Sequence, residues 1–412
     1  MLNFYIRIFF PLAFGYYLSY FYRTVNAIIA PDIISELAFT PAQIGWVSSA
    51  YFASFALFQI PLGILLDRIE IRKLCAFLLL FAAIGSLVFA LNDSVAMLWF
   101  GRFLIGLGVS ACLMGAFKAY VMWLPTERLP LMNGLQLGAG GIGALTATTP
   151  VELALQITDW RGVFLVLAAV TLVSSLLIIC LVPKQKIAVP QNNVFEQLWE
   201  YFDILKSPIF YAVAPLSFLA QAAFISIQSL WAGQWLREAI LLPREVAAQY
   251  LLISAAATVL GYVGMGSIAS KLQKIGISSR TVSITGLNLF LGVQILIVLR
   301  VDIPTPVIWG LFGFIGTSGS LMYATLLQQF PKRLSGRVIT SLNLLLFVSI
   351  FLLQWIMGLI VNLWPIAASG HSPLIAYQYA FSLAISLQVV GLIWYLSQRK
   401  KLLSLLNRPL SE

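Results

Sequence analysis

Apolar runs of about 20–28 residues recur along the whole chain and are separated by short polar turns. Runs of this length cross the ~30 Å hydrocarbon core of a bilayer when they are helical. Backbone groups in lipid must be hydrogen-bonded within the protein, so continuous apolar segments have to be helices. The composition agrees, because 60% of the 412 residues are hydrophobic and only 10% are charged. The sequence therefore predicts an all-α integral membrane protein.

Twelve transmembrane helices are expected, six on each side of the longest polar interruption. They lie at 6–30, 41–66, 74–92, 95–123, 132–156, 161–182, 209–235, 246–269, 280–300, 304–328, 338–363 and 375–397. The expected units are an N-terminal six-helix bundle (1–183), a cytoplasmic linker (184–207), a C-terminal six-helix bundle (208–398) and a cytoplasmic tail (399–412). Within the linker, apolar residues at helical spacing between Phe195 and Leu205 predict an amphipathic helix on the membrane surface.

Basic residues follow alternate loops. One side of the membrane receives 18 of the 25 Lys and Arg, and the other side receives four: Arg161, Arg237, Arg244 and Arg300. The positive-inside rule then places both termini in the cytoplasm. The same distribution argues against nucleic-acid binding, despite a net charge of +10. The short loops are typical of a multi-pass protein of the bacterial inner membrane.

Two short sequence segments of the first half are repeated in the second half. The charged hairpin that begins at Gly63 has a weaker copy that begins at Gly266, about 200 residues later. The segment 125–128 (Pro-Thr-Glu-Arg) likewise matches 331–333 (Pro-Lys-Arg). Repeated landmarks in the same order indicate an internal duplication. Transporters built from two repeats bind their substrate between the halves, near the middle of the membrane.

The hairpin at 63–73 resembles the Gly-x-x-x-Asp-Arg-x-Gly-Arg-Arg/Lys motif of the major facilitator superfamily, and the resemblance covers essentially the whole chain. Glu70 and Ile71 depart from the motif, and Lys73 helps to restore its basic end. The resemblance implies two pseudo-symmetric six-helix bundles and a loop that latches the halves in the outward-facing state. The latch residues that it implies are Gly63, Asp67, Arg68 and Arg72.

Other segments resemble motifs of the same family. Arg102, Gly106 and Gly108 match its Arg-x-x-x-Gly-x-Gly pattern in the fourth span, where the arginine is linked to proton coupling. Residues 160–164 resemble its Trp-Arg-x-x-Phe signature. The fifth span is similar to the glycine-rich motif of antiporters, but Ala139 stands where proline is expected, which leaves antiport open. Its glycines, which allow close helix packing, are Gly134, Gly138, Gly141 and Gly143.

A charge in hydrocarbon costs about 2.5–3.5 kcal/mol on insertion scales, so each cation inside a span calls for a partner. We expect Arg23 to face the cavity and hold an anionic substrate, flanked by Tyr20, Tyr22 or Asn26. The alternative is an arginine that bonds carbonyl groups of a neighbouring helix. Lys118 lies near the cytoplasmic end of its span. It either snorkels to the interface or provides a second contact for the anion.

Proton coupling requires a group that changes its protonation state. Arg102 could pair with Asp32 at the outer end of the first span, either as a coupling pair or as a static one. Glu152 is the one carboxylate well inside an expected span. Either Asp32 or Glu152 titrates during transport, or the proton travels on an acidic substrate.

The polar candidates of the second half are uncharged. We expect Gln228, Trp231 and Asn343 to face the cavity. Gln221, Gln234 and Gln354 are expected to be packing contacts, because amide side chains also join helices in membranes.

Three embedded cations without a central anion favour a negatively charged substrate. We therefore expect a monomeric secondary active transporter that works by alternating access and takes up a small organic anion with protons, such as a carboxylate metabolite or carboxylate-type chelator. The alternative is proton-driven efflux of a drug-like or amphiphilic metabolite. We expect no cofactor, and the partners are the substrate, protons and the bilayer. No Ser/His/Asp set or phosphate-binding loop favours an enzyme, and a single histidine excludes a His-rich metal site.

Overall fold

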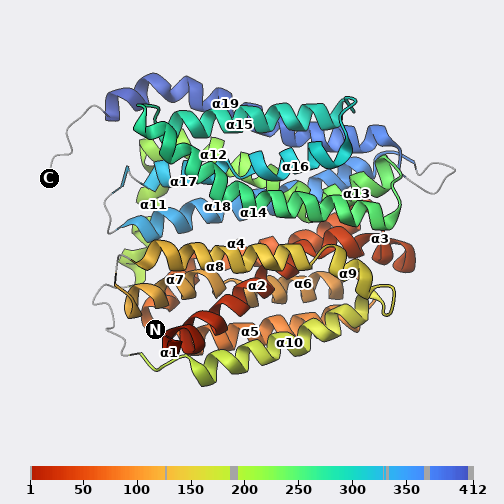
Figure 1. The fold of residues 1–412 in the computed structure, drawn as a ribbon, viewed down its shortest axis with the longest axis horizontal. Coiled ribbons are helices and arrows are strands. Elements are labelled where there is room, and N and C mark those ends of the chain that lie inside the picture. Colours follow the sequence, from red (N-terminus) through yellow and green to blue (C-terminus); the bar gives the residue numbers. More distant parts are fainter. Residues whose placement is uncertain are drawn as a thin grey trace.

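The computed structural model describes residues 2–125, 128–185, 194–327, 329–330, 334–365 and 372–406. Its elements are helices that run side by side in two groups, one from each half of the chain (Figure 1). The first group contains α1 (Leu2–Phe4), η1 (Tyr5–Phe9), α2 (Phe10–Thr24), α3 (Asn26–Leu37), α4 (Pro41–Arg68), α5 (Ile71–Ala90), α6 (Val95–Val109), α7 (Cys112–Trp123), α8 (Leu129–Thr146), α9 (Thr149–Ala154) and α10 (Trp160–Leu181).

The second group follows the linker helix α11 (Val194–Lys206). It contains α12 (Pro208–Ser226), η3 (Ile227–Trp231), α13 (Ala232–Gln234), η4 (Trp235–Ala239), α14 (Arg244–Lys274), α15 (Ser279–Val298), α16 (Thr305–Gly316), α17 (Gly319–Leu327), α18 (Ser335–Val361) and α19 (Leu374–Leu406). The elements labelled η are π-helical turns.

Nine helices in the described ranges are long and apolar enough to cross a membrane, and each matches one of the expected spans. The other three expected spans, at 6–30, 132–156 and 304–328, appear as consecutive shorter helices: α2 with α3, α8 with α9, and α16 with α17. Helix α19 continues to Leu406, whereas the sequence predicted a tail from 399. The repeat landmark at 331–333 lies outside the described residues.

The starts of the helices have local causes. Thr40 precedes α4 and forms a capping box: its Oγ1 accepts from the backbone N–H of Gln43 at 3.2 Å, and its own N–H donates to Gln43 Oε1 at 2.8 Å. Pro41 follows, at a position where a missing N–H costs nothing. Asp159 caps α10 in a similar way, because its Oδ1 accepts from the N–H of Gly162 at 2.7 Å.

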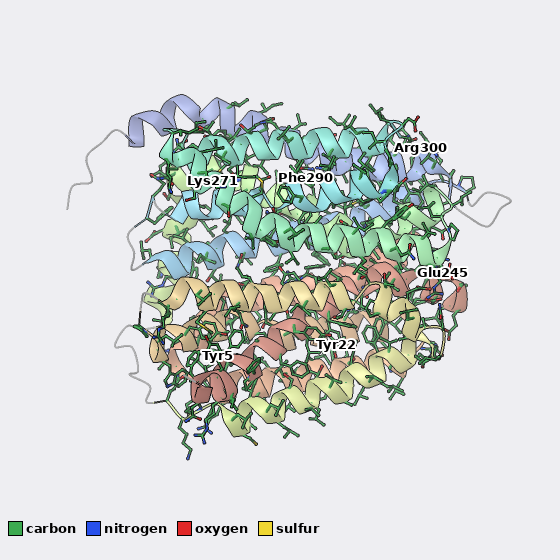
Figure 2. All side chains as sticks on the ribbon, in the orientation of Figure 1. Tyr5, Tyr22, Glu245, Lys271, Phe290 and Arg300 are labelled. Atoms are coloured by element: carbon green, nitrogen blue, oxygen red, sulfur yellow. The ribbon has the colours of Figure 1, made fainter. Side chains whose placement is uncertain are left out.

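The assembly has two ends, which we name for the chain termini. The terminal end carries the start of α1, the last turns of α19 and helix α11, and Lys271 lies on the same side (Figures 1 and 2). The distal end carries the turns that follow α3, α9 and η4, together with Glu245 and Arg300.

The two halves are in backbone contact at the distal end. A Cβ atom added at Gly45 of α4 would lie 2.8 Å from the carbonyl oxygen of Gln354 on α18. One added at Gly358 of α18 would lie 2.5 Å from the carbonyl oxygen of Pro41. Small residues allow this approach, as they do in other membrane helix pairs. Helices α4 and α18 therefore close the distal end of the interface.

Helices α8 and α14 also meet across the interface, but they diverge toward the terminal end. Gly141, Gly138 and Gly134 lie on one face of α8, at steps of three and four residues. A Cβ added at Gly141 would lie 2.5 Å from Val259 Cγ2 of α14, whereas one added at Gly138 or Gly134 would meet no atom within 4 Å. The halves are thus closed at the distal end and separated along this face at the terminal end.

The linker forms the expected helix at 194–206. Trp199 and Phe202 are 64% and 52% exposed, whereas Tyr201 and Ile204 are buried against the protein. The hydroxyl of Tyr201 lies so close to Gly63 that an added Cβ would be 2.7 Å from it. Helix α11 therefore packs on α4 at the charged hairpin. The remainder of the expected linker, at 186–193, lies outside the described residues.

Candidate substrate site and contacts between the halves

Arg23 lies one residue before the end of α2 and is only 8% exposed. Its Cζ atom lies 4.5 Å from the ring centroid of Tyr20, 5.6 Å from that of Phe55 and 5.9 Å from that of Tyr51. The ring of Phe347, on α18 of the second half, is 5.8 Å away. Its Nε has no hydrogen-bond partner among the described residues. The guanidinium is therefore enclosed by aromatic faces from both halves, which attract a cation without neutralising it.

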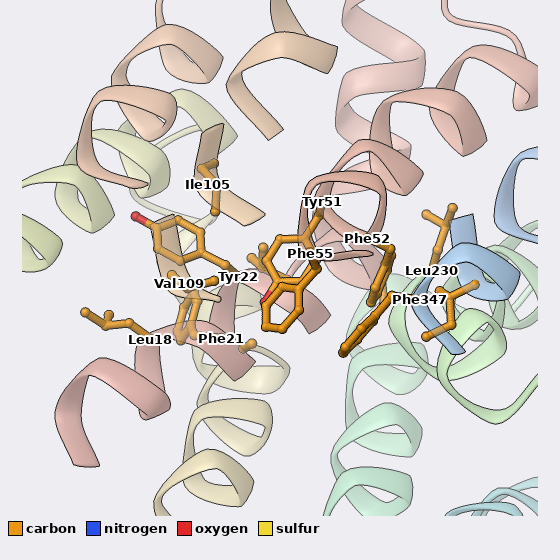
Figure 3. Close-up of a cluster of buried hydrophobic side chains, with 14 of the residues drawn as sticks. Leu18, Phe21, Tyr22, Tyr51, Phe52, Phe55, Ile105, Val109, Leu230 and Phe347 are labelled. Carbon is orange, nitrogen blue, oxygen red and sulfur yellow. The ribbon is translucent and has the colours of Figure 1, made fainter. Parts of the chain in front are cut away.

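Figure 3 shows the aromatic rings of α4 and α18 that meet at this point. Phe52 and Phe55 project from α4 toward Phe347 of α18, and the Phe55 and Phe347 rings are 4.5 Å apart. Tyr51 is fully buried on the same helix, and its hydroxyl donates to the carbonyl of Ser19 at 3.0 Å. The aromatic cluster is thus fixed on the first half and touches the second half through one ring.

The three residues that were expected to flank Arg23 differ in where their side chains lie. Tyr20 flanks the guanidinium as expected. The Nδ2 of Asn26 donates to Ser48 Oγ at 2.8 Å, and its buried Oδ1 has no hydrogen-bond partner in the part of the chain that the structure describes. Tyr22 points into the first half, where its hydroxyl and Thr171 Oγ1 share a 2.9 Å hydrogen bond (Figure 3). Adjacent helical residues face different directions, so Tyr22 is corrected to a packing residue.

The expected pair of Arg102 and Asp32 is not formed. Arg102 is 1% exposed, and its Nη1 donates to the carbonyl of Tyr22 at 2.9 Å. Its Cζ lies 5.4 Å from the Tyr51 ring, which therefore stands near both buried arginines. Asp32 is held elsewhere, by Arg244.

Arg244 joins the two halves at the distal end. It is the first residue of α14, and its Nη1 and Nη2 bond the two carboxylate oxygens of Asp32 at 2.6 and 2.7 Å. Its Nε forms an ion pair with Glu152 Oε1 at 2.5 Å. Glu152 belongs to α9 and is 4% exposed. One guanidinium thus binds two carboxylates of the first half, in part through the bidentate geometry that makes such pairs strong.

Lys118 adopts a structural position. Its Nζ donates to the carbonyl of Leu66, in the last turn of α4. Carbonyl groups at a helix C-terminus lack intrahelical partners and attract cations. The Lys118 ammonium thus binds a helix terminus, a contact that neither expectation, snorkelling to the interface or a second contact with the anion, had named.

In the charged hairpin, Glu70, Arg72 and Lys73 make contacts within the first half. Arg72 Nε bonds Glu70 Oε2 at 2.9 Å, its Nη1 reaches the carbonyl of Ile179 on α10 at 3.4 Å, and Lys73 pairs with Glu70 Oε1 at 2.7 Å. Hydrogen bonds from Lys73 and Arg72 lower the pKa of the Glu70 carboxyl. This contribution to stability is present above the unfolded-state pKa and is lost as the pH falls through the folded-state value. The expected role of Asp67 falls on a side chain outside the described ones.

The three uncharged candidates of the second half also differ in their surroundings. Gln228 Nε2 donates to Thr258 Oγ1 at 2.8 Å within that half. Trp231 is fully buried, and its ring lies 3.4 Å from a Cβ placed at Gly45, so it packs against the distal contact. Asn343 is partly buried on α18, one turn before Phe347. Of the three, Asn343 lies on the helix face that meets the aromatic cluster.

The amides that were expected to be packing contacts are buried. Gln354 Nε2 donates to Ser229 Oγ at 2.8 Å, and Gln221 and Gln234 are 4% and 1% exposed.

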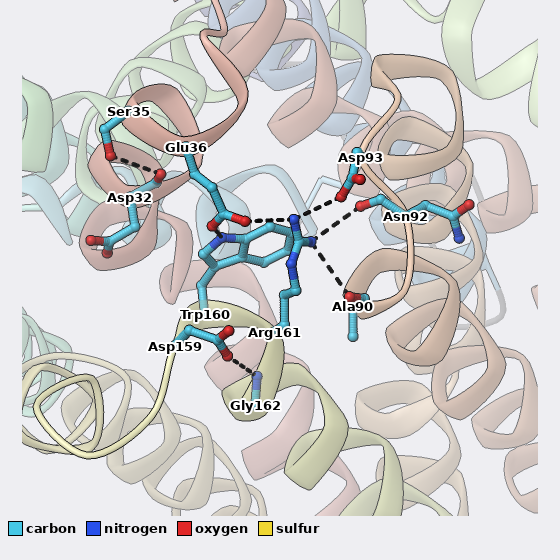
Figure 4. Close-up of polar contacts among 10 residues, drawn as sticks. All are labelled: Asp32, Ser35, Glu36, Ala90, Asn92, Asp93, Asp159, Trp160, Arg161 and Gly162. Carbon is cyan, nitrogen blue, oxygen red and sulfur yellow. Dashed lines mark hydrogen bonds and ion pairs between the residues drawn. The ribbon is translucent and has the colours of Figure 1, made fainter.

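The Trp-Arg signature forms a clamp inside the first half (Figure 4). Arg161 Nη2 bonds Glu36 Oε1 and Asp93 Oδ1, both at 2.7 Å, and its guanidinium stacks 4.0 Å from the Trp160 ring. Trp160 Nε1 donates to Glu36 Oε2 at 2.6 Å. These contacts tie the distal ends of α3, α5 and α10 together.

Sequence reasoning missed Tyr51, Phe55 and Phe347 around Arg23, and it missed Arg244 as a partner of the acids. The rings carry no distinguishing signal among many apolar aromatics, and Arg244 was read as an ordinary loop cation. Their roles depend on which helix faces meet.

Comparison with known proteins decides the family. The family model described as Major Facilitator Superfamily matches residues 12–354. The chain belongs to this superfamily. Together with the apolar helices described above, this membership makes it a multi-pass membrane protein of a transporter family.

Individual relatives are more distant. The chain is 28% identical over 157 residues to a probable sulfoacetate transporter of Cupriavidus necator, over 38% of this chain and 36% of that protein. It is 24% identical over 202 residues to an efflux transporter of Emericella nidulans, over 49% of this chain and 37% of that protein. The chain thus spans a little over a third of the length of these two relatives.

The fold is also that of a solved transporter. A bacterial homologue of the human lysosomal transporter Spinster, in an inward-facing and occupied conformation, matches with a TM-score of 0.78. The match covers 96% of each chain at 16% sequence identity, so it establishes the shared fold alone.

Proposed function

We propose that this transporter takes up a small organic anion together with protons by alternating access, with Arg23 as the residue that binds the anion. In this proposal the terminal end faces the cytoplasm, as the distribution of basic residues favours. The membrane would be a bacterial inner membrane and the transporter a monomer.

The observation that carries the proposal is the aromatic enclosure of Arg23. Its guanidinium is buried where the halves meet. Among the residues that the structure describes, no carboxylate pairs with it and its Nε has no hydrogen-bond partner. A substrate carboxylate would supply the missing charge and accept two parallel N–H bonds. The rings of Phe55 and Phe347 would contact the carbon skeleton of the substrate. Because Phe347 belongs to the other half, the bound substrate would contact residues of both halves. The name of the probable sulfoacetate transporter also describes an organic anion.

Proton coupling is proposed at the Arg244 bridge. A proton on Asp32 or Glu152 would remove one of the two ion pairs that join the halves at the distal end. Loss of that pair would favour opening of this end to the outside, where uptake begins. Arg102 would support coupling through its position beside Tyr51.

Proton-driven efflux of a drug-like or amphiphilic metabolite is the second candidate. The glycine face of α8 and the relative described as an efflux transporter favour it. Two observations separate the candidates: whether binding depends on negative charge, and which direction of proton gradient drives accumulation.

Ligand-dependent thermal stabilisation is the decisive experiment. Purified wild type, Arg23→Gln and the control Arg300→Gln are heated with anionic, neutral and cationic metabolites. An anion at 100 times its dissociation constant should add about 2.7 kcal/mol to the stability of the wild type. Arg23→Gln should lose this response and Arg300→Gln should keep it. Equal stabilisation of all three proteins by neutral or cationic compounds would reject Arg23 as the anion site and favour efflux.

A further inference from the structure

The linker helix α11 has no part in the proposed transport steps, and it carries two large exposed rings. Trp199 is 64% exposed and Phe202 is 52% exposed, and their ring centroids are 5.9 Å apart. Residues three positions apart in a helix lie on the same face, so the two rings form one surface. Lys206, one turn beyond Phe202, is exposed as well. We name these three side chains the aromatic flank of α11.

The other side of α11 is bound to the protein. Tyr201 and Ile204, also three positions apart, are 4% and 3% exposed. The Tyr201 hydroxyl lies against Gly63 of α4, and Ile204 belongs to the same buried apolar cluster as Val338 of α18. Helix α11 therefore contacts both halves near the terminal ends of α4 and α18, while its aromatic flank remains exposed.

The depth of α11 relative to the membrane follows from what it touches. Gly63 lies inside the apolar span Pro41–Leu66, near its terminal end. A single residue, Ser207, separates α11 from α12, and α12 begins the apolar span Pro208–Ala239. Because α11 packs against the ends of these spans, it runs along the membrane boundary rather than out into solvent.

A second aromatic pair marks the same level on the adjoining helices. Tyr211, in the first turn of α12, is 58% exposed and packs edge-on against Trp394 of α19, with the ring centroids 4.9 Å apart. Trp394 Nε1 donates to the carbonyl of Tyr211 at 2.9 Å. Tyr and Trp are enriched where the hydrocarbon meets the headgroups, because their rings are apolar and carry one polar atom. The junction of α11 and α12 therefore lies at this interfacial level.

We propose that the aromatic flank of α11 is a lipid-docking surface that binds the headgroup region of the leaflet on the terminal side. The rings of Trp199 and Phe202 lie at the boundary of headgroups and acyl chains, which removes apolar area from water. The Lys206 ammonium reaches the lipid phosphates. Through the contacts of Tyr201 and Ile204, the docked helix ties the leaflet to both halves. The docking does not depend on the anion proposed for Arg23.

Nitroxide labels measure the position of the flank in liposomes of phosphatidylcholine and phosphatidylglycerol. Trp199→Cys and Phe202→Cys are labelled one at a time in the full chain, after the exposed Cys180 is changed to serine. Oxygen concentrates in lipid and a nickel chelate in water, so the ratio of their collision rates reports depth. Val166→Cys, 62% exposed on the membrane-spanning α10, is the lipid control, and Lys274→Cys, at the exposed end of α14, is the water control.

Both labels on α11 should favour oxygen over the chelate, with a smaller ratio than the lipid control because the flank lies near the headgroups. Labels that favour the chelate as strongly as the water control would show a solvated flank and overturn the docking. Labels that neither reagent reaches, with spin–spin broadening between copies, would assign the surface to a second copy of the chain and also overturn it.

Exchange of the α11 amide hydrogens in lipid nanodiscs is an independent measurement. The double variant Trp199→Ser, Phe202→Ser removes both rings and should accelerate exchange at 200–206 by about tenfold, because the docked rings stabilise the helix against local opening. Asp203→Ser, an exposed substitution on the same helix, is the matched control and should leave exchange nearly unchanged. A double variant that exchanges no faster than this control would contradict the docking.

Discussion

Two buried arginines in the first half occupy different surroundings at the residue scale. Arg23 lies at the contact between the halves, with rings of both halves around it. Arg102 is enclosed within the first half, and the hydrogen bond described for it goes to the carbonyl of Tyr22. A cation is retained in such a place against its desolvation cost, so each arginine is expected to act in transport.

Replacement of Arg102 should change stability and transport in opposite directions. Arg102→Met preserves volume and removes the desolvated charge, so the free energy of unfolding should rise by about 1–4 kcal/mol. Proton-driven accumulation in proteoliposomes should fall, while binding at Arg23 persists. Thermal unfolding and gradient-driven uptake measure the two effects. A variant that is more stable and fully coupled would show that Arg102 has no part in coupling.

At the scale of elements, the contacts along the glycine face of α8 depend on the conformation of the transporter. Gly141 is in contact with Val259 of α14, and Gly138, one turn away on the same face, has open space. The two positions therefore differ in what they tolerate in this conformation. A side chain at Gly141 would meet the stiff, β-branched Val259.

A substitution at Gly141 should shift the conformational equilibrium, whereas the same substitution at Gly138 should not. Gly141→Val costs about 1–3 kcal/mol in the distally closed state through overpacking, so it should populate the distally open state. Gly138→Val is the matched control, which fits the present state and should preserve it.

Spin labels at Ile157 and Leu241, which are 90% and 61% exposed at the distal ends of the two halves, report the separation. The exposed Cys180 is replaced by serine beforehand. The distance should lengthen in Gly141→Val but not in Gly138→Val. Equal behaviour of the two variants would contradict the divergence of α8 and α14.

For the whole molecule, the Arg244 bridge and the α4–α18 contact hold the halves together at one end. The bridge is asymmetric, because Glu152 is nearly enclosed while the side chains of Asp32 and Arg244 are 26% and 29% exposed. The pair with Glu152 is therefore less screened by solvent than the pair with Asp32.

A double-mutant cycle tests this asymmetry. Arg244→Gln leaves Glu152 buried without its partner and should lower the free energy of unfolding by about 2–4 kcal/mol, less than for a fully buried pair. Adding Glu152→Gln removes the stranded charge and should recover most of the loss, whereas adding Asp32→Asn should recover little. Glu245→Gln, at the neighbouring exposed position, serves as the control. Equal recovery by the two second mutations would show that both acids are equally screened.

The sequence by itself determined the membrane class, the positions of the helices and the family. Continuous apolar runs permit only helices in lipid, and the motifs at 63–73 and 160–164 are local in the chain. It also singled out Arg23, because a charge within an apolar run is visible without coordinates. The linker helix was readable for the same reason, since its apolar residues repeat at helical spacing.

Only the tertiary structure decided the partners. Asp32 binds Arg244, 212 positions away, in place of Arg102. Tyr22 turns away from Arg23, and Phe347 completes the aromatic enclosure from the other half. These contacts depend on the rotation of each helix about its axis and on how the halves meet. An all-round apolar helix in lipid carries no polar face that fixes its rotation, so packing alone settles it.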